Sequence, residues 1–295
     1  MSEHYEDHRV LKEIIEKNIQ NNTHFLIGRF SDIETRVVHH YIIKKNKKGE
    51  LFQLENNAGI HIKDLQSLNT FTRTVFNAFR DCTVHGIWKN DVMSKCIEDS
   101  QTFIRKFAIQ VPAIYAAVLE PMYFFEKGYD ATYLRAFRGK RVLIVSPFVD
   151  TMKTQVERGA LKHIYGFSEY MDGVEFIFVK APVTLAGNHN GKDWQEHFAG
   201  LKESIAAAGE FDIALLGCGG YGMPASHYIY KELGKSAIYV GGALQLFFGI
   251  MGRRWLKSEF YAKYYTGDKT KTYWVTPDVN EKPPGLKRVE GGCYW

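Results

Sequence analysis

Short apolar runs alternate with longer segments of helical periodicity along the chain. The runs are too short for amphipathic helices and are predicted to be strands, at residues 25–27, 84–88, 114–119, 142–145, 174–179, 213–216 and 237–240. Helices are expected at residues 10–19, 31–42, 65–79, 91–107, 131–137, 194–208 and 225–233, and another is expected to begin near Asp150. This alternation predicts an α/β fold with a mostly parallel sheet and helices on both faces.

Two segments carry little apolar periodicity. A basic run that contains Lys44, Lys45, Lys47 and Lys48 closes one predicted helix and leads into a polar loop. Such a charge cluster is typical of a solvated surface, and contact with an acidic acceptor or with lipid headgroups stays open. The proline-containing segment after Tyr264 is expected to wrap the surface. We therefore expect one domain, residues 1–264, and a tail, residues 265–295, that packs on it.

The most informative stretch is residues 211–255. Its predicted strand Ile213–Leu216 runs directly into a turn with four glycines, Gly217, Gly219, Gly220 and Gly222. Pro224 suits the first turn of the helix that follows, and the next strand ends at Gly241 and Gly242. This order is a βαβ unit, whose glycine turn exposes backbone N–H groups at a helix N-terminus. The unit is suited to an anion, most often a phosphate.

Three of these glycines also match the dinucleotide pattern G-x-G-x-x-G, namely Gly217, Gly219 and Gly222. A nicotinamide enzyme needs an acidic residue about twenty positions later to hold the ribose hydroxyls. That region reads Gly241-Gly242-Ala243 and contains no carboxylate. The phosphate interpretation is therefore favoured over the dinucleotide one. A purely structural role, in which the glycines only permit tight strand-to-helix packing, stays open.

Composition narrows the class of protein. Hydrophobic residues make up 45% and charged residues 24% of the 295 positions, which excludes disorder and coiled coil. The net charge of +5 favours anionic partners without requiring nucleic acid. The four cysteines lie far apart without metal-type pairing, which indicates free thiols in a reducing compartment. With no signal peptide or apolar run of membrane length in the sequence, we expect a cytoplasmic protein without a transmembrane segment.

The segment Ser31-Asp32-Ile33-Glu34 has two interpretations of similar weight. The spacing S-x-x-E is a capping box, which satisfies amides at a helix N-terminus and needs no function. Asp32 and Glu34 are also hard oxygen ligands of the kind that hold Mg²⁺ or Mn²⁺ beside substrate phosphates, and Arg29 just before them suits a phosphate oxygen.

Other candidates carry weaker signals. Glu120 and Asp150 follow predicted strands, where open α/β sheets place ligands, so either suits a general base, although helix capping also explains Asp150. Residues 188–191 suit a pocket lining or a polar turn. None of the eleven histidines shows a zinc motif, which disfavours a catalytic zinc. The chain also lacks a nucleophile elbow and a Walker A lysine.

Several segments together resemble the GT-D-like glycosyltransferase family over nearly the whole chain: GRFSDIE, LIVSPF, LLGCGGYGMP, GGALQLFFGIMGRRW and EGGCYW. The resemblance implies a Rossmann-like fold of the GT-D type and a nucleotide-sugar donor of the UDP or GDP type. It also implies a D-x-E motif, Asp32 and Glu34 in this chain, that binds Mn²⁺ or Mg²⁺ and the donor diphosphate. The acceptor would be a glycan or another glycoconjugate, and a homodimer stays open.

We combine the resemblance with the patterns above into one predicted site. The catalytic candidates are Asp32, Glu34, Arg29 and Asp150. The candidates for donor binding are Gly28, Gly217, Gly219, Gly220, Tyr221, Gly222, Gly241, Gly242, Gln245 and Arg253. The turns at residues 217–222 and 241–245 are expected to lie side by side, because neighbouring parallel strands end at the same edge.

Arg253 and Arg254 follow an apolar run, residues 244–250, and have two interpretations. Two cations at the C-terminus of a helix interact favourably with its dipole, which requires no ligand. The alternative is that this segment packs across the sheet and directs at least one arginine toward the donor diphosphate or an anionic acceptor. For the whole protein, a nicotinamide-dependent oxidoreductase and a non-catalytic nucleotide-binding protein are the other hypotheses, and the latter would have no use for Asp32 and Glu34.

Overall fold

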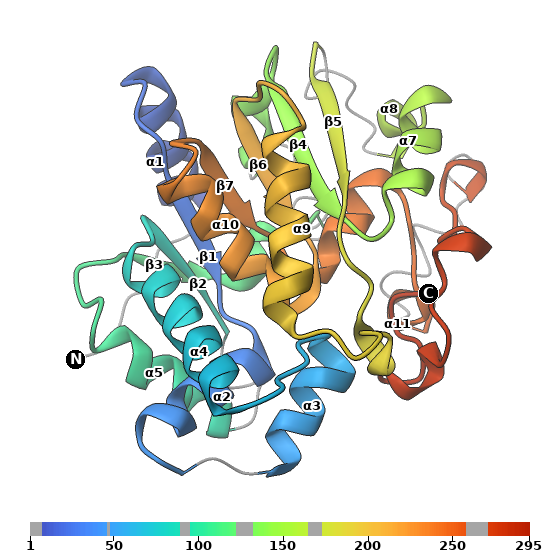
Figure 1. Ribbon diagram of the computed structural model, residues 1–295. Helices are drawn as coiled ribbons and strands as arrows, with labels where there is room; N and C mark the ends of the chain where they lie inside the picture. The colour runs from blue at the N-terminus through green and yellow to red at the C-terminus, as the bar shows by residue number, and fades with distance from the viewer. Residues whose placement is uncertain (1–7, 46–47, 89–94, 122–131, 165–172, 258–270) are drawn as a thin grey trace.

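The computed structural model describes residues 8–45, 48–88, 95–121, 132–164, 173–257 and 271–295 (Figure 1). Within these ranges the chain forms one seven-stranded, all-parallel sheet in the order β3-β2-β1-β7-β6-β4-β5. The strands are β1 Leu26–Arg29, β2 Val84–Ile87, β3 Ala113–Tyr115, β4 Arg141–Ser146, β5 Glu175–Lys180, β6 Ile213–Leu216 and β7 Ser236–Tyr239. The predicted Rossmann-like α/β fold is confirmed, and its sheet is fully parallel.

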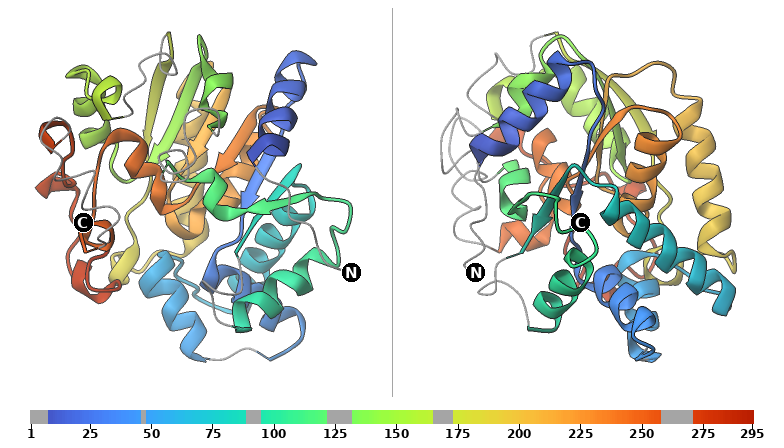
Figure 2. Two further views of the ribbon diagram at one scale, coloured as in Figure 1. Left: turned by 180° about the vertical axis from the view of Figure 1, so that it is seen from behind. Right: turned by 90° about the vertical axis from the view of Figure 1, so that its left-hand side faces the viewer.

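Helices cover both faces of this sheet (Figure 2). One face packs against α4 Leu65–Arg80, α9 Trp194–Ala206 and α10 Gly222–Lys231. The other packs against α1 His8–Gln20, α7 Val149–Glu157, α8 Leu161–Ile164 and the 3₁₀ segments η3 Tyr133–Phe137 and η7 Gly242–Phe248. Successive side chains of a strand point to opposite faces. The face with α4, α9 and α10 carries a first apolar cluster, and the face with α1, α7 and α8 carries a second. Ile144 belongs to the second cluster, whereas its neighbours Leu143 and Val145 belong to the first. The central strands are therefore buried on both sides.

Three further helices lie beyond the carboxyl ends of the strands, near the lower part of Figure 1: α2 Asp32–Ile42, α3 Lys48–Ala58 and α5 Lys95–Arg105. The helix α3 corrects the prediction of a polar loop after the lysine run. Leu51, Leu54 and Ala58 recur at helical spacing and pack into the first cluster, so one apolar stripe is enough to anchor this otherwise polar helix.

The apolar run before the two arginines folds differently from the prediction. Residues 242–248 form the 3₁₀ segment η7, bounded by Gly241 at φ 79° and Gly249 at φ 67°. Arg253 and Arg254 open the short helix α11, Arg253–Leu256, rather than close a longer one. Residues 243–248 are buried all round, so their sequence carries no amphipathic period from which the turn could be predicted.

Smaller differences from the prediction concern where elements begin and end. Residues 116–119 form a 3₁₀ turn, η1 Ala116–Leu119, where a strand was predicted. The helix α10 begins at Gly222, so that Pro224 lies within its first turn, as expected. The predicted helix starts at Asp91 and Ala131 and the start of the predicted tail, residues 265–270, lie outside the described residues.

The C-terminal segment, residues 271–295, contributes to the core as well as to the surface. It contains η8 Lys271–Tyr273, η9 Val279–Glu281 and η10 Leu286–Arg288. Trp274 and Trp295 are buried in the same cluster as η7, and the Trp295 indole N–H donates to the Glu281 carbonyl at 2.9 Å. An isolated bridge joins Val275 to Ile250. No helix in the described ranges combines the length and apolarity needed to cross a membrane.

The sheet order explains where a ligand can bind. After β4 the chain continues into α7 on one face, and after β6 it continues into α10 on the opposite face. Neighbouring strands whose connections diverge in this way leave a crevice at their carboxyl ends, where open α/β sheets bind ligands. The strands β1, β7, β6 and β4 are consecutive in the sheet, so their turns surround this crevice.

Candidate functional site

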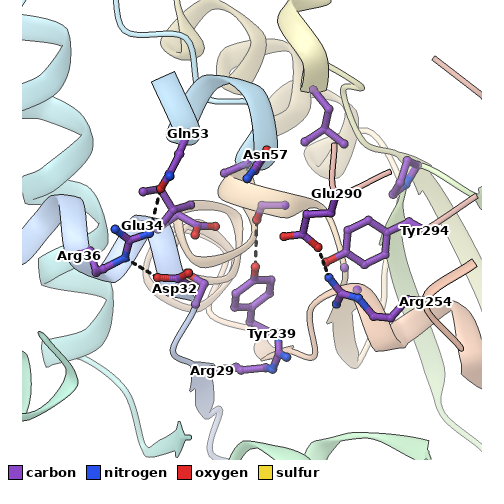
Figure 3. A pocket seen from close by; sticks show the side chains of 18 of the residues that line it. Arg29, Asp32, Glu34, Arg36, Gln53, Asn57, Tyr239, Arg254, Glu290 and Tyr294 are labelled. Atoms are coloured by element: carbon purple, nitrogen blue, oxygen red, sulfur yellow. Dashed lines mark hydrogen bonds and ion pairs between the residues drawn. The ribbon is translucent and has the colours of Figure 1, made fainter. Parts of the chain in front are cut away.

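A cavity of about 370 Å³ opens at the carboxyl edge of the sheet (Figure 3). Segments from distant parts of the chain line it: the β1–α2 junction, the helix α3, the turns after β4, β6 and β7, and the C-terminal segment. Of the predicted site residues, Arg29, Asp32, Glu34, Gly217, Gly219 and Gly242 are in its wall. The fold thus brings the D-x-E motif and the glycine turns to one place.

Asp32 and Glu34 lie in the first turn of α2, directly after the end of β1. The hydroxyl of Ser31, the residue before this helix, makes no capping hydrogen bond to it, so the reciprocal pair of a capping box is not formed. The Asp32 side chain is 48% exposed and its Oδ1 accepts from Arg36 Nε at 2.5 Å. Glu34 is only 7% exposed. Both carboxylates nevertheless border the same cavity (Figure 3).

Burial raises the pKa of Glu34 above its ordinary value, and the Asp32 charge nearby adds to this effect. Hydrogen bonds from its own backbone amide and from the Ser31 hydroxyl, together with the Arg29 charge, act in the opposite direction. Desolvation is the largest of these effects. A cation in the cavity would therefore relieve an unfavourable charge at this carboxylate.

Arg29, the last residue of β1, is held from two sides. Its Nη2 lies 3.2 Å from Glu120 Oε1, and its guanidinium lies 4.4 Å from the centre of the Trp88 ring. Its Nε is buried and has no hydrogen-bond partner among the described residues. Burial raises the pKa of Glu120, and the Arg29 charge lowers it. Glu120, a candidate base from the sequence, thus reaches the site as the partner of Arg29.

Two more arginines border the cavity. Arg36 bonds Asp32, and its other nitrogens approach Glu50 at 3.4 Å and Gln53 at 3.0 Å. Arg254 Nη2 lies 2.5 Å from Glu290 Oε2, and its guanidinium lies 4.7 Å from the centre of the Tyr294 ring. Three guanidinium groups therefore surround one cavity, each paired with a carboxylate, and a phosphate would bind them only by replacing these partners.

Arg253 and Arg254 differ in position although they are adjacent in sequence. Arg254 lines the cavity, whereas Arg253 donates through Nη1 to the Gly291 carbonyl at 3.1 Å and is not in the cavity wall. This geometry agrees with the hypothesis that one of the pair faces the cavity. The residue that does so is Arg254, whereas Arg253 was the predicted donor-binding residue.

The two glycine turns are adjacent, as predicted. Leu216 of β6 pairs with Tyr239 of β7, and a Cβ added to Gly217 would lie 2.6 Å from the Gly241 carbonyl. Gly219, at φ 57°, adopts a backbone conformation that side chains rarely take. The Tyr239 hydroxyl donates to the Gly219 carbonyl at 3.0 Å and fixes the turn from the neighbouring strand.

Other predicted glycines contact protein side chains rather than the cavity. A Cβ on Gly28 would lie 2.5 Å from Cys82 Sγ, and one on Gly222 would overlap the Tyr239 ring. One on Gly220 would meet Ile60. For these positions the structural interpretation, tight packing between strand and helix, accounts for the glycine.

Four predicted residues also lie outside the cavity wall. Tyr221 is buried, and its hydroxyl lies 3.3 Å from the Thr184 hydroxyl. Gln245 is buried and donates to the carbonyls of Ile250 and Tyr294, both at 3.2 Å. Gly241 turns the chain beside Arg29. Asp150 is exposed, pairs with Lys180 at 2.6 Å and borders a separate depression beside Glu281.

The structure adds cavity residues that the sequence did not reveal. These are Arg36, Gln53, Asn57, Trp88, Tyr239, Glu290 and Tyr294. Gln53 and Asn57 are four residues apart and therefore share one face of α3, which is a detectable signal once that helix is known. Glu290 and Tyr294 lie within the C-terminal EGGCYW, whose approach to the site depends on long-range packing.

We compared the chain with protein-family models, with curated proteins and with solved structures, and no match was found. The family resemblance therefore stays a prediction.

Proposed function

We propose that this protein is a glycosyltransferase that moves a sugar from a nucleotide-sugar donor to a glycan or another acceptor. One observation carries the proposal: the Asp32/Glu34 pair, three arginines and two glycine turns converge on one cavity at the carboxyl edge of a parallel sheet. A nucleotide-sugar combines a diphosphate, which needs cationic partners, with polar groups that suit Gln53 and Asn57.

The residues at the start of α2 fit a divalent metal. Two carboxylates offer hard oxygen ligands, which Mg²⁺ and Mn²⁺ prefer, and donor phosphates would complete the coordination. The raised pKa of Glu34 is consistent with a carboxylate that a cation stabilises. Once bound, the ion would neutralise charge that develops on the leaving diphosphate.

The chain itself contributes positioning and charge. Arg254 and Arg36 are within the cavity wall, where guanidinium groups can bind phosphate oxygens in pairs. To do so, each must exchange its carboxylate partner, Glu290 or Asp32, for the ligand. Tyr294 and Trp295 form an aromatic part of the wall.

The sequence after β7 weighs against the nicotinamide-dependent alternative. In the dinucleotide pattern an acidic residue about twenty positions after the glycines holds the ribose hydroxyls, but this chain has Gly241, Gly242 and Ala243 there. A titration that monitors NADH fluorescence tests this alternative directly. A non-catalytic nucleotide-binding protein would bind the donor and never cleave it.

The test is release of nucleoside diphosphate from UDP-sugars and GDP-sugars by the purified protein, with and without Mn²⁺. We expect metal-dependent release, and we expect Asp32→Asn and Glu34→Gln to abolish it. Glu210→Gln is the matched control, because Glu210 is an exposed carboxylate paired with Lys235 outside the cavity. Equal turnover of Asp32→Asn and wild type in Mn²⁺ would refute the metal assignment.

A further inference from the structure

A second group of ligand-type side chains lies on the other side of α3 from the cavity. It contains Glu55 of α3, His61 just after this helix, and His189, which follows the 3₁₀ segment η5 Leu185–Gly187. Gln53 and Asn57 face the cavity, and a residue two positions from each points to the opposite side of a helix. The carboxylate of Glu55 and the ring nitrogens of the two histidines offer one ligand atom each, and these three atoms all lie within 4.8 Å of one another.

The distances within the group suit a single small ion. Glu55 Oε2 lies 3.1 Å from His61 Nδ1, and Glu55 Oε1 lies 3.4 Å from His189 Nε2. The two imidazole rings are stacked, with centroids 3.7 Å apart and planes 6° from parallel. Both rings therefore approach one carboxylate. Because a metal ion lies in the plane of each imidazole that binds it, one ring must rotate out of the stack before both can bind a tetrahedral ion with bonds of about 2.0–2.1 Å.

The backbone holds the three ligands in place. The His61 carbonyl accepts the Trp194 N–H at 3.0 Å, and the His189 carbonyl accepts from His197 Nε2 at 3.0 Å. Thr184 ties η5 to the end of α3, because its hydroxyl donates to the Gly59 carbonyl at 2.6 Å. These contacts keep the three side chains close together, and only the orientation of the rings must change for an ion to bind.

We propose that Glu55, His61 and His189 form a zinc site. Two imidazole nitrogens and a carboxylate are a common ligand set for Zn²⁺, whereas Mg²⁺ and Mn²⁺ prefer sets made of oxygen alone. The side chains of Glu55, His61 and His189 are 35%, 22% and 16% exposed, so a water molecule can reach the fourth position. This site is separate from the Asp32/Glu34 pair and does not depend on the proposed function.

Zinc binding requires local changes at both histidines. His61 Nδ1 donates to Glu55 Oε2 in the metal-free protein, so its proton must move to Nε2, and one of the stacked rings must rotate. The Gly191 N–H donates to His189 Nδ1 at 3.1 Å, so in the metal-free protein the proton of His189 is on Nε2 and faces Glu55. Coordination through Nε2 moves this proton to Nδ1, and the Gly191 N–H must then turn away. Asn190 and Gly191 both have positive φ, 54° and 70°, in a turn that can rearrange without disturbing a helix or strand.

A bound ion would connect two parts of the cavity wall. Leu185 of η5 and Ala58 of α3 both line the cavity, and the three ligands flank these residues in sequence. Zinc would therefore fix α3, with Gln53 and Asn57, relative to η5. The inferred role is to link these two parts of the cavity wall, with water as the fourth ligand.

The test uses the full chain after treatment with a chelator. Calorimetric titration with ZnCl₂ should show one saturable site per chain, and zinc should raise the melting temperature, because a ligand bound only by the native state stabilises it. His61→Gln and His189→Gln should each weaken binding by more than about tenfold. Asp32→Asn should bind zinc as wild type does, and so should His163→Gln, whose ring stacks on Tyr273 on the opposite face of the sheet.

Two results would overturn the zinc site: no saturable binding at micromolar zinc, or wild-type affinity in both histidine variants. Melting in chelator shows whether each variant folds. If either variant does not fold, Co²⁺ is added to the wild-type protein instead. A tetrahedral site of this composition gives visible absorption bands with Co²⁺, and the absence of these bands would refute the proposed zinc site. None of these measurements reads sugar transfer, so the two proposals fail independently.

Discussion

Asp32 and Glu34 are two positions apart on one helix yet have opposite surroundings. The Asp32 side chain is 48% exposed and paired with Arg36, whereas Glu34 is buried and its pKa is raised by desolvation. The two carboxylates of the D-x-E motif therefore start from different electrostatic states. A ligand cation would gain more from Glu34, whose charge is poorly compensated, than from Asp32, which already has a partner.

At Arg254 the structure predicts a change in binding rather than in folding. Arg254→Ala should weaken the binding of UDP or GDP by more than about tenfold, because a charge-assisted hydrogen bond contributes about 1.5–3 kcal/mol. Arg253→Ala is the comparison, since that guanidinium bonds the Gly291 carbonyl outside the cavity wall. Calorimetric titration of both variants measures the difference, and equal affinities would contradict the assignment of Arg254.

His85 predicts a dependence of stability on pH. The ring is fully buried between Phe30 and Phe79, and its Nε2 donates to the Phe79 carbonyl at 2.7 Å. Burial lowers the pKa of His85 to about 4, and Arg105 adds to this effect. As the pH falls below 6.5, His85 becomes protonated in the unfolded chain but stays neutral in the folded one. Acidification to pH 4 should therefore lower the free energy of unfolding by up to about 3 kcal/mol through this residue.

His85→Gln isolates this effect, because glutamine can still donate to the Phe79 carbonyl but does not titrate. Denaturant unfolding between pH 4 and pH 7 should show a smaller loss of stability on acidification in the variant than in the wild type. Parallel stability curves for the two proteins would contradict the prediction. Other carboxyl groups titrate in both proteins, so only the difference between the curves is assigned to His85.

At the scale of elements, the turn after β6 is shaped by its neighbour β7. Tyr239 of β7 packs over Gly222 and bonds the Gly219 carbonyl. One tyrosine thus fills the space left by one glycine and holds the backbone of another. The glycine pattern in the sequence suggests a ligand site, but part of it is explained by packing. Of its three glycines, only Gly217 and Gly219 line the cavity.

Gly222→Ala should therefore destabilise the protein. Its Cβ would overlap the Tyr239 ring, and overpacking of this kind costs about 1–3 kcal/mol. Gly200→Ala is the matched control: Gly200 lies inside α9 with no atom within 4 Å of an added Cβ. That substitution should be stabilising by about 0.5–1 kcal/mol, because alanine is the better helix former. Denaturant unfolding measures both, and equal effects would refute the packing argument.

At the scale of the whole molecule, the sequence predicts the class of fold well. A central strand such as β4 has a short, wholly apolar run, residues 142–145, because both faces of the sheet are covered, and this pattern is local. The D-x-E motif and the glycine turns were also found, since they follow strands directly. Arg254, Glu290 and Tyr294 required the structure, because the path of residues 271–295 back to the cavity depends on packing and not on any periodic pattern.

Trp295 tests how far this C-terminal segment supports the core. Its ring is 5% exposed, packs against Phe148 and donates to the Glu281 carbonyl. Trp295→Ala should lower the free energy of unfolding by about 3–5 kcal/mol. Trp295→Phe should lower it less, because most of the buried ring remains. Chemical denaturation distinguishes the two, and an alanine variant as stable as wild type would show that the segment only rests on the surface.

The pairing of β1 with β7 also has a consequence for how the protein reaches its native state. The Phe25 N–H donates to the Ser236 hydroxyl, a contact between residues 211 positions apart, and β7 alone joins β1 to β6 in the centre of the sheet. Contacts so distant in sequence form slowly, because the entropy of closing a long loop is lost before the contacts stabilise the chain. Until β7 docks, β1 and β6 would both have open edges that can pair with other chains. The cavity, which needs the turns after all three strands, is therefore among the last features to form, and ligand affinity would report the completion of folding.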